Sequence, residues 1–436
     1  MTDNLDAGDP AARATLRPCP ACGGGHGRPL HRVRLRPPDG HPLGDGYELV
    51  TCDRCGAGFA DAAVRPADYQ AWYARHAKYA GEAAAAHGHA GGAAETAWTA
   101  ARVEATAARL ARLLPPGARV LDVGCATGAL LAALGRRGAG EVVGVDPSPQ
   151  AAEVAARVHR VRVEVGSFGA LPPRLGRFDA VCATGVLEHL WDTEEAMLAV
   201  RGLLRPGGLL YLEVPDAARY DQPLLVPFQD FSTEHVNHFS AATLDTLVAR
   251  HGGVVLWRGP ADAEQAEGVP VAVLAGAWRL DAPPAQQPPP RPDRALRLRP
   301  DGALRLRPDG ALRLRLAAYA RGSAALLARV DAHLRAQLAG APAVYVWGAG
   351  ELLATLLAGT VLGELPLAGL ADGNPARHGL RFGGVPVGPP GALHDADLPV
   401  VVASVLSDGP IRAAAARLGL PNRLVGVAPA PASMTW

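Results

Sequence analysis

Four cysteines near the N-terminus form two pairs of Cys-x-x-Cys spacing, Cys19 with Cys22 and Cys52 with Cys55. Two intervening residues let both thiolates face one metal from a tight turn, and the glycines after each pair leave the backbone free to curl toward the sulfurs. Four soft thiolates in a reducing compartment select zinc, held in a closed tetrahedral site. We therefore expect structural Zn2+ that holds together a small N-terminal domain. A redox pair and unligated thiols are the alternatives.

Two Glu-His dipeptides are the second feature that could do chemistry. Glu188-His189 ends the stretch FDAVCATGVLEHL, and Glu234-His235 lies in FQDFSTEHVNHFS. A histidine is suited to general acid–base catalysis near neutral pH, and a carboxylate beside it can orient the ring. His238 follows three residues after His235, so it either shares a helical face with His235 or flanks it. Metal binding by these histidines and carboxylates is an alternative, although the ligands are few.

A glycine turn that could bind a ligand lies in the sequence between the cysteine pairs and the Glu-His dipeptides. In ARVLDVGCATGALLAAL, a short buried strand containing Asp122 leads into a turn from Gly124 to Gly128, and a helix follows. The spacing Asp-x-Gly-x-x-x-Gly differs from the Gly-x-Gly-x-x-Gly of dinucleotide-binding domains. The next strand, EVVGVD, ends at Asp146, 22 positions after Gly124. A carboxylate at that strand tip can accept two hydrogen bonds from a ribose diol. A dinucleotide-binding domain with a degenerate loop is the alternative.

These motifs, together with VEVGSFGALP, FDAVCATGVLEHL and LLRPGGLLYLEVP in that order, resemble the class I S-adenosylmethionine (SAM)-dependent methyltransferases over about residues 95–280. The resemblance implies SAM as cofactor, with Ser167 and Phe168 near the adenine and a turn at Pro206-Gly207-Gly208 before the fifth strand. The residues that it assigns to cofactor binding are Asp122, Gly124, Gly128, Asp146, Ser167 and Phe168.

The second Glu-His segment is similar to a narrower family, the three-domain, zinc-containing deoxysugar C-methyltransferases, which carry Glu-His-x-x-Tyr-Phe-Ser. These enzymes methylate carbon 3 of a nucleotide-linked 4-keto sugar through an enolate. The resemblance implies that His235 is the general base, that Glu234 orients it, and that His189 holds the enolate or the sugar. Ser232 stands where the family tends to carry a tyrosine, and His238 replaces the tyrosine of Tyr-Phe-Ser. An O- or N-methyltransferase of natural-product biosynthesis and a non-catalytic SAM-binding scaffold are the alternatives.

The length of 436 residues predicts about three domains. We expect an α/β protein in which a Rossmann-like SAM domain lies between an N-terminal zinc ribbon and a small C-terminal Rossmann-like domain. The predicted boundaries are residues 1–78 for the zinc-binding domain, 79–280 for the methyltransferase domain, 281–316 for a linker and 317–436 for the C-terminal domain.

The linker is rich in proline and arginine and repeats the octapeptide ALRLRPDG at 295–302, at 303–310 and in part at 311–315. Its alternating residues could form short hairpins, although an expanded repeat in a surface linker is the favoured interpretation. The C-terminal domain is expected to be a small parallel α/β unit with a Gly348-x-Gly350 turn, in which Leu353 occupies the place of a third glycine.

The balance of charge excludes some partners. With 43 basic and 42 acidic residues the formal net charge is +1, which gives no overall electrostatic case for nucleic acid or membranes. The acidic N-terminus lacks the apolar core of a signal peptide, and no apolar run is long enough to span a bilayer. We expect a soluble cytoplasmic protein whose partner is a small molecule, a nucleotide-sugar by the resemblance. The sequence does not predict the oligomeric state.

Overall fold

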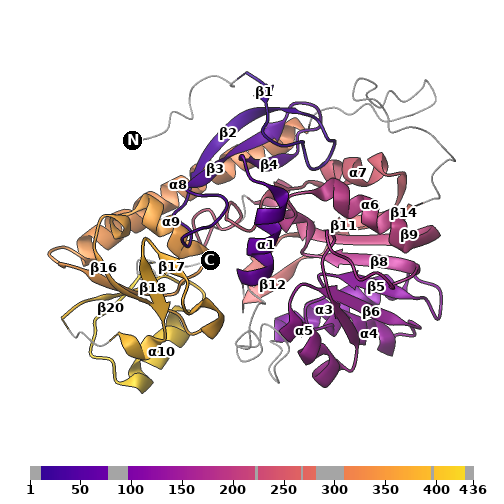
Figure 1. Cartoon of the computed structure of the whole chain (residues 1–436). Coiled ribbons are helices and arrows are strands. Elements are labelled where there is room, and N and C mark those ends of the chain that lie inside the picture. The colour runs from indigo at the N-terminus through magenta and orange to yellow at the C-terminus, as the bar shows by residue number, and fades with distance from the viewer. Residues whose placement is uncertain are drawn as a thin grey trace.

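The computed structural model describes residues 11–76, 97–220, 224–266, 269–280, 309–393 and 397–427. Figure 1 shows an N-terminal sheet (indigo) above two α/β units, the central one in magenta and the C-terminal one in yellow. The expected fold class is confirmed: an antiparallel sheet with four cysteines, a central Rossmann-like sheet and a C-terminal α/β sheet. The domain boundaries themselves stay predictions.

The N-terminal sheet has the order β1-β2-β3-β4-β10 and is followed along the chain by helix α1. Its elements are β1 (Arg13–Ala14), β2 (His26–Arg34), β3 (Gly46–Cys52), β4 (Gly58–Asp61), α1 (Pro66–His76) and β10 (Asn237–His238). The last strand comes from far along the chain and pairs antiparallel with β4, Asn237 opposite Phe59. His238 is thus extended, and it flanks His235 instead of sharing a helical face with it.

The central sheet has the order β11-β14-β9-β8-β5-β6-β7, with β14 antiparallel between β9 and β11 and the other neighbours parallel. Its strands are β5 (Val120–Val123), β6 (Val142–Asp146), β7 (Arg162–Val165), β8 (Phe178–Thr184), β9 (Leu204–Pro215), β11 (Gly253–Pro260) and β14 (Val273–Leu280). β5 is buried at all four residues, as expected of a strand covered on both faces. The chain order reverses between β5 and β8, and ligands of such sheets bind at the carboxyl ends beside that reversal.

Helices cover both faces of the central sheet (Figure 1). They are α3 (Ala97–Ala111), α4 (Ala129–Arg136), α5 (Pro149–Val154), η1 (Ala155–His159), η2 (Leu187–His189), α6 (Thr193–Leu203), η3 (Ala217–Arg219) and α7 (Ala241–Arg250), and a small hairpin joins β12 (Ala263–Ala266) to β13 (Val269–Val271). The turn expected at Pro206-Gly207-Gly208 lies inside β9. There the pairing with β8 slips, because Phe178 faces Leu204 while Ala180 faces Leu209, and Gly207 takes a φ of 75°.

Helix α8 (Gly310–Gln337) begins inside the predicted linker. Residues 310–316, including the incomplete third repeat, form its first turns, so that copy is helical and not a hairpin. The cause is local: the Asp309 carboxylate accepts a hydrogen bond from Leu312 N at 3.0 Å and caps a run of good helix formers. The rest of the predicted linker, residues 281–308, lies outside the described residues. α8 packs against β2 and β4 of the N-terminal sheet and against α9 of the C-terminal unit.

The C-terminal sheet has the order β17-β18-β16-β15-β19-β20. Its elements are β15 (Val344–Trp347), α9 (Glu351–Gly359), η4 (Val361–Gly363), β16 (Leu367–Ala371), η5 (Pro375–Arg377), β17 (Arg381–Phe382), β18 (Val385–Gly388), η6 (Pro390–Ala392), β19 (Val400–Val402), α10 (Asp408–Leu418) and β20 (Leu424–Gly426). The sheet is mixed, not purely parallel as expected, because β17 and β18 form an antiparallel hairpin at its edge. Within the described ranges, no helix is long and apolar enough to cross a membrane.

Candidate functional site

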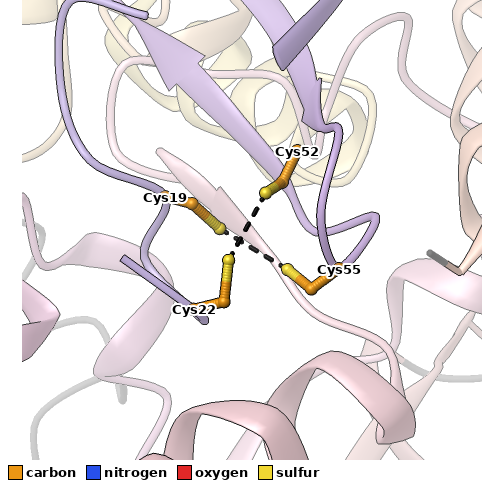
Figure 2. A group of neighbouring side chains, drawn as sticks. All are labelled: Cys19, Cys22, Cys52 and Cys55. Atoms are coloured by element: carbon orange, nitrogen blue, oxygen red, sulfur yellow. Dashed lines mark hydrogen bonds between the residues drawn. The ribbon is translucent and has the colours of Figure 1, made fainter. Parts of the chain in front are cut away.

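The four N-terminal cysteines converge on one point (Figure 2). Cys19 Sγ lies 3.6 Å from Cys55 Sγ, and Cys22 Sγ lies 3.5 Å from Cys52 Sγ; all four are buried and free of disulfides. A tetrahedral zinc with Zn–S bonds of about 2.3 Å has sulfurs about 3.8 Å apart, so this donor set fits zinc closely. The two knuckles are tight turns, since Gly23 N donates to Cys19 O and Gly56 N donates to Cys52 O.

The glycine turn after β5 forms a cradle with no room for side chains. Gly124 and Gly128 have φ values of 77° and 78°, and a Cβ on them would lie 2.5 Å from Val186 Cγ2 and 2.4 Å from Val161 Cγ2. Asp122 is 1% exposed, and its Oδ1 has no hydrogen-bond partner among the described residues. Burial, with Asp146 and Glu213 nearby, holds the pKa of Asp122 well above its usual value. An orphaned buried oxygen beside a glycine turn fits a ligand that brings its own donor.

Asp146 stands at the tip of β6, where the sequence predicted it. Its Oδ2 accepts a hydrogen bond from Ala126 N at 2.8 Å, and its Oδ1 accepts one from Ser148 N at 2.9 Å. Each oxygen keeps a further lone pair, so the carboxylate can brace the glycine turn and still accept from a ribose diol. Ser167 and Phe168 come just after β7, the strand next to β6, and Phe168 is 6% exposed. The cofactor roles of these residues stay predictions.

The structure brings the two Glu-His dipeptides together. Val236 N donates to Glu188 O at 2.8 Å, and the Asn237 side-chain amide donates to Leu187 O and to Leu190 O, both at 2.7 Å. As a result the rings of His189 and His235 lie 5.0 Å apart, edge to face.

The His189 ring is hydrogen-bonded at one nitrogen and has a carboxylate near the other. Its Nδ1 lies 3.0 Å from Glu234 O and its Nε2 lies 3.8 Å from Glu188 Oε1. Burial raises the pKa of Glu188, and the neighbouring His189 offsets only part of that rise. Ligand atoms of Glu188, His189 and His235 fall within 4.8 Å of one another. The described residues thus offer three ligand atoms here, and the pair is equally suited to proton transfer.

Asp230 is a carboxylate beside His235 that the sequence did not single out. Its Oδ1 lies 4.0 Å from His235 Nδ1, and burial raises the pKa of Asp230 to about 6. It therefore joins Glu234 as a candidate to orient the ring. Ser232, which replaces the family's tyrosine, caps the same segment: its Oγ accepts from Glu234 N and from His235 N, each at 3.2 Å.

His238 has a structural place. It is 0% exposed, packs edge to face with Phe231 at 5.0 Å, and has its Nδ1 3.4 Å from the Tyr220 hydroxyl. Burial lowers the pKa of His238 to about 3, with Arg17 adding to the effect, so the ring is neutral at physiological pH.

Two histidines between the cysteine pairs, His31 and His41, were expected to be solvated, but both pack against aromatic rings. His41 is 8% exposed and lies edge to face with Trp72 at 5.0 Å, while His31 stacks on Phe228 at 5.2 Å.

A pocket beside the histidine pair is lined by three parts of the chain. Its wall contains rings from α1 and from the loop between β2 and β3, the Thr233-Glu234 segment, and the start of α9 with Arg377. The lining residues are Pro38, His41, Tyr69, Trp72, Tyr73, His76, Thr233, Glu234, Ala349, Gly350, Glu351, Ala354, Arg377, Leu380 and Phe382. Tyr73 also contacts the His189 ring, with centroids 5.2 Å apart, so the pocket adjoins the pair. Tyr69 and Tyr73, both on α1, contribute their rings to this lining.

The Gly348-x-Gly350 turn is held by a carboxylate in the same way as the turn after β5. Asp372 follows β16, and its carboxylate accepts from Ala349 N and from Asn374 N, both at 2.8 Å, as Asp146 does in the central domain. A Cβ on Gly350 would lie 2.7 Å from Arg377 Nη1, so the guanidinium rests against the bare backbone. Arg377 and Glu351 were not predicted; their only signal is closeness in sequence to the glycine turn and to the end of β16.

Comparison with known proteins agrees with this geometry. Residues 97–256 match the family model described as "Methyltransferase domain". A ubiquinone biosynthesis O-methyltransferase of Xanthomonas axonopodis pv. citri is 42% identical over 109 residues, which cover 23% of this chain and 45% of that protein. A probable S-adenosylmethionine-dependent methyltransferase of Mycolicibacterium smegmatis is 30% identical over 164 residues, which cover 32% and 62%. The chain thus spans about half the length of these curated relatives.

Among solved structures, the 1,6-didemethyltoxoflavin-N1-methyltransferase of Burkholderia thailandensis aligns with a TM-score of 0.38 at 20% identity, covering 53% of this chain and 97% of that one. That score is too low to carry an argument. The matched family model, the strand order and the glycine cradle agree with one another: residues 97–256 match a methyltransferase domain.

Proposed function

We propose that this protein is a SAM-dependent C-methyltransferase acting on a nucleotide-linked keto-deoxysugar, with His235 as the general base. The observation that carries the proposal is the pairing of His189 and His235, 5.0 Å apart, beside a pocket lined by all three parts of the chain. Neither histidine would face the other without the long-range contacts of β10, so the fold itself assembles the pair.

SAM would be held by the glycine cradle, with Asp122 and Asp146 as acceptors, and it supplies an already activated methyl group. The four-cysteine cluster would hold Zn2+, which supplies only rigidity because four thiolates leave no open position. The protein must therefore generate the nucleophile and align it.

His235 would accept the proton from the carbon beside the substrate's keto group, and the C–H electron pair would move into the enolate. Asp230, 4.0 Å from His235 Nδ1, favours the protonated ring that results. His189 has its Nδ1 directed at Glu234 O; with a second proton on Nε2 it would donate a hydrogen bond to the enolate oxygen. After the carbon is methylated, His235 returns its proton to solvent.

The pocket supports a substrate that carries both a ring and an anionic group. Trp72 and Tyr73 offer flat faces, and Arg377 lies beside the first residues of α9, where backbone N–H groups favour an anion. A nucleoside diphosphate linked to a sugar has both features. These contacts support the substrate class that the sequence resemblance implies.

O-methylation is the second candidate, because the curated relatives include ubiquinone biosynthesis O-methyltransferases. His235 would then remove a hydroxyl proton, and no carbon acid would be needed. The two reactions are separated by incubating the enzyme with substrate in deuterated water in the absence of SAM. Only the C-methyltransferase should wash deuterium into the carbon next to the ketone.

The direct test is to incubate purified protein with SAM and a dTDP-4-keto-6-deoxysugar and to measure the product mass. We expect a product heavier by one CH2 group, and His235→Gln should lose about 10²- to 10⁴-fold in turnover. His26→Gln is the matched control, because His26 is exposed on β2 and takes no part in the site. Full turnover in His235→Gln would refute the base assignment. If the protein failed to bind SAM in calorimetry, both proposed methyltransferase reactions would be refuted.

A further inference from the structure

Thr233, two residues before His235, is the point where the three parts of the chain meet. Its carbonyl oxygen accepts a hydrogen bond from the Tyr69 hydroxyl of α1 at 2.7 Å. Its backbone N and its Oγ1 both donate to Glu351 Oε2, at 2.8 Å and 2.7 Å. One residue of the histidine segment is thus held from the N-terminal side by a tyrosine and from the C-terminal side by a carboxylate.

Glu351 is placed for this contact by the C-terminal fold. It is the first residue of α9, directly after the Gly348-x-Gly350 turn, and the turn is braced by Asp372. The N-terminal and C-terminal parts are also fastened to each other: Arg36 N donates to Ala354 O at 2.9 Å on the same helix. Thr233 is therefore hydrogen-bonded between α1 and α9, which belong to two parts of the chain that also bond directly to each other.

The 230–235 segment depends on contacts with other elements: Asp230 N donates to the Tyr319 hydroxyl at 2.8 Å, and Phe231 is fully buried. It contains no helix or strand, and the hydrogen bonds from Glu234 N and His235 N end on Ser232 Oγ, within the segment itself. A loop of this kind keeps one conformation only through contacts with its surroundings. The carboxylate of Glu351 provides two of them at the residue next to the Glu-His dipeptide.

We propose that Glu351 is a positioning residue for His235, so that the C-terminal domain takes part in the reaction by fixing the catalytic segment as well as by lining the substrate pocket. The inference deepens the proposed function and rests on it only for the identity of the reaction. The clamp itself is a property of the free protein. Burial, together with the nearby Glu234, raises the pKa of Glu351 to about 7, in keeping with its place between packed elements.

Two variants separate the hydrogen bonds from the charge. Glu351→Gln keeps a carbonyl oxygen that can accept from both Thr233 donors, whereas Glu351→Ala removes the acceptor. Glu364→Ala is the matched control, because Glu364 lies in the same domain and pairs with Arg335 on the surface. All three proteins are compared as the full-length chain.

The substrate-independent readout is amide hydrogen exchange of the peptide spanning residues 228–240, measured by mass spectrometry on the free protein. We expect exchange at least tenfold faster in Glu351→Ala, and within about twofold of the original in Glu351→Gln and Glu364→Ala, since each tenfold step equals about one ordinary hydrogen bond. Unchanged exchange in Glu351→Ala would overturn the proposal, and so would general acceleration across the C-terminal sheet, which would mean lost folding.

The kinetic readout uses whichever methyl acceptor the protein proves to accept. Glu351→Ala should lower kcat about tenfold or more and leave the KM for SAM within twofold, and Glu351→Gln should restore most of kcat. A change confined to the KM for the methyl acceptor would show that Glu351 binds substrate and positions nothing. If no acceptor is turned over, the proposed function fails while the exchange result still decides whether the clamp exists.

Discussion

The buried Arg17 links the cysteine cluster to both histidine segments, and its removal gives a sharp test of the architecture. Arg17 is 6% exposed and lies two residues before Cys19. Its Nη1 donates to Trp191 O at 3.1 Å, and its Nη2 donates to Val236 O at 3.2 Å and to the Asn237 side-chain oxygen. The guanidinium also lies over the Trp191 ring, 4.3 Å from its centroid. Trp191 and Val236 are close neighbours of His189 and His235.

The cost of Arg17→Met follows from these contacts. Val236 O keeps a second donor, Ala60 N at 2.9 Å, whereas Trp191 O and Asn237 Oδ1 lose the donor that Arg17 provides. A buried acceptor left without a donor costs about 1–3 kcal/mol, so two of them cost about 2–6 kcal/mol. Burial of the guanidinium is itself unfavourable, because desolvation lowers the pKa of Arg17 to about 10. Removing the charge therefore offsets part of the cost of the lost hydrogen bonds. We expect a net destabilisation of about 2–4 kcal/mol.

Urea unfolding of the full chain measures this cost, with Arg32→Met as the control. Arg32 lies on β2 and pairs with Asp45 at the surface, where an ion pair contributes at most about 1 kcal/mol. Below the unfolding transition, kcat should fall about tenfold or more in Arg17→Met, because a histidine displaced by 1 Å loses its alignment, while the affinity for SAM stays within twofold. An Arg17→Met protein with unchanged midpoint and unchanged kcat would refute the linkage.

Asp146→Ala should weaken SAM binding about tenfold to a thousandfold in calorimetry, because it removes the acceptor for the ribose and the brace of the glycine turn; unaltered affinity would mean that the cofactor lies elsewhere. Gly128→Ala should lower the unfolding midpoint by the equivalent of about 1–3 kcal/mol, since the new Cβ meets Val161 at 2.4 Å with φ at 78°. A zinc chelator should lower the unfolding midpoint, and Cys22→Ser should remove the metal measured by atomic absorption. Full stability without the metal would exclude a structural role. His238, whose pKa is lowered to about 3 from 6.5, binds protons more readily in the unfolded chain between those values, so stability is present above pH 6.5 and is lost as the pH falls. Between pH 7 and pH 5 the loss from this residue is about 2 kcal/mol, and His238→Gln should show that much less acid destabilisation.

Local pattern was enough to predict the strands of the methyltransferase domain. A parallel strand buried on both faces is a short apolar run, so Val120, Leu121 and Val123 marked β5, and the acidic residue at the end of the next run marked the tip of β6. The cysteine knuckles carry an equally local signal, and the structure brings all four sulfurs together.

Long-range contacts could not be predicted in this way. β10 is two residues long and owes its existence to pairing with β4, which lies far away in the sequence. That pairing turns His238 into a core residue and sets His235 against His189. The roles of Glu351 and Arg17 depend on the same tertiary packing, because neither sits in a motif that predicts its partner. The early start of α8 was local, however, and the Asp309 cap could have revealed it.

The central claim is that His235, held beside His189, removes a proton from carbon before methyl transfer. Its most direct test is deuterium incorporation into a dTDP-4-keto-6-deoxysugar in deuterated water, without SAM, followed by NMR at the carbon next to the ketone. The account predicts enzyme-dependent exchange that persists in His26→Gln and falls at least a hundredfold in His235→Gln. Methyl transfer to this sugar without any exchange, or exchange that survives His235→Gln, would contradict it.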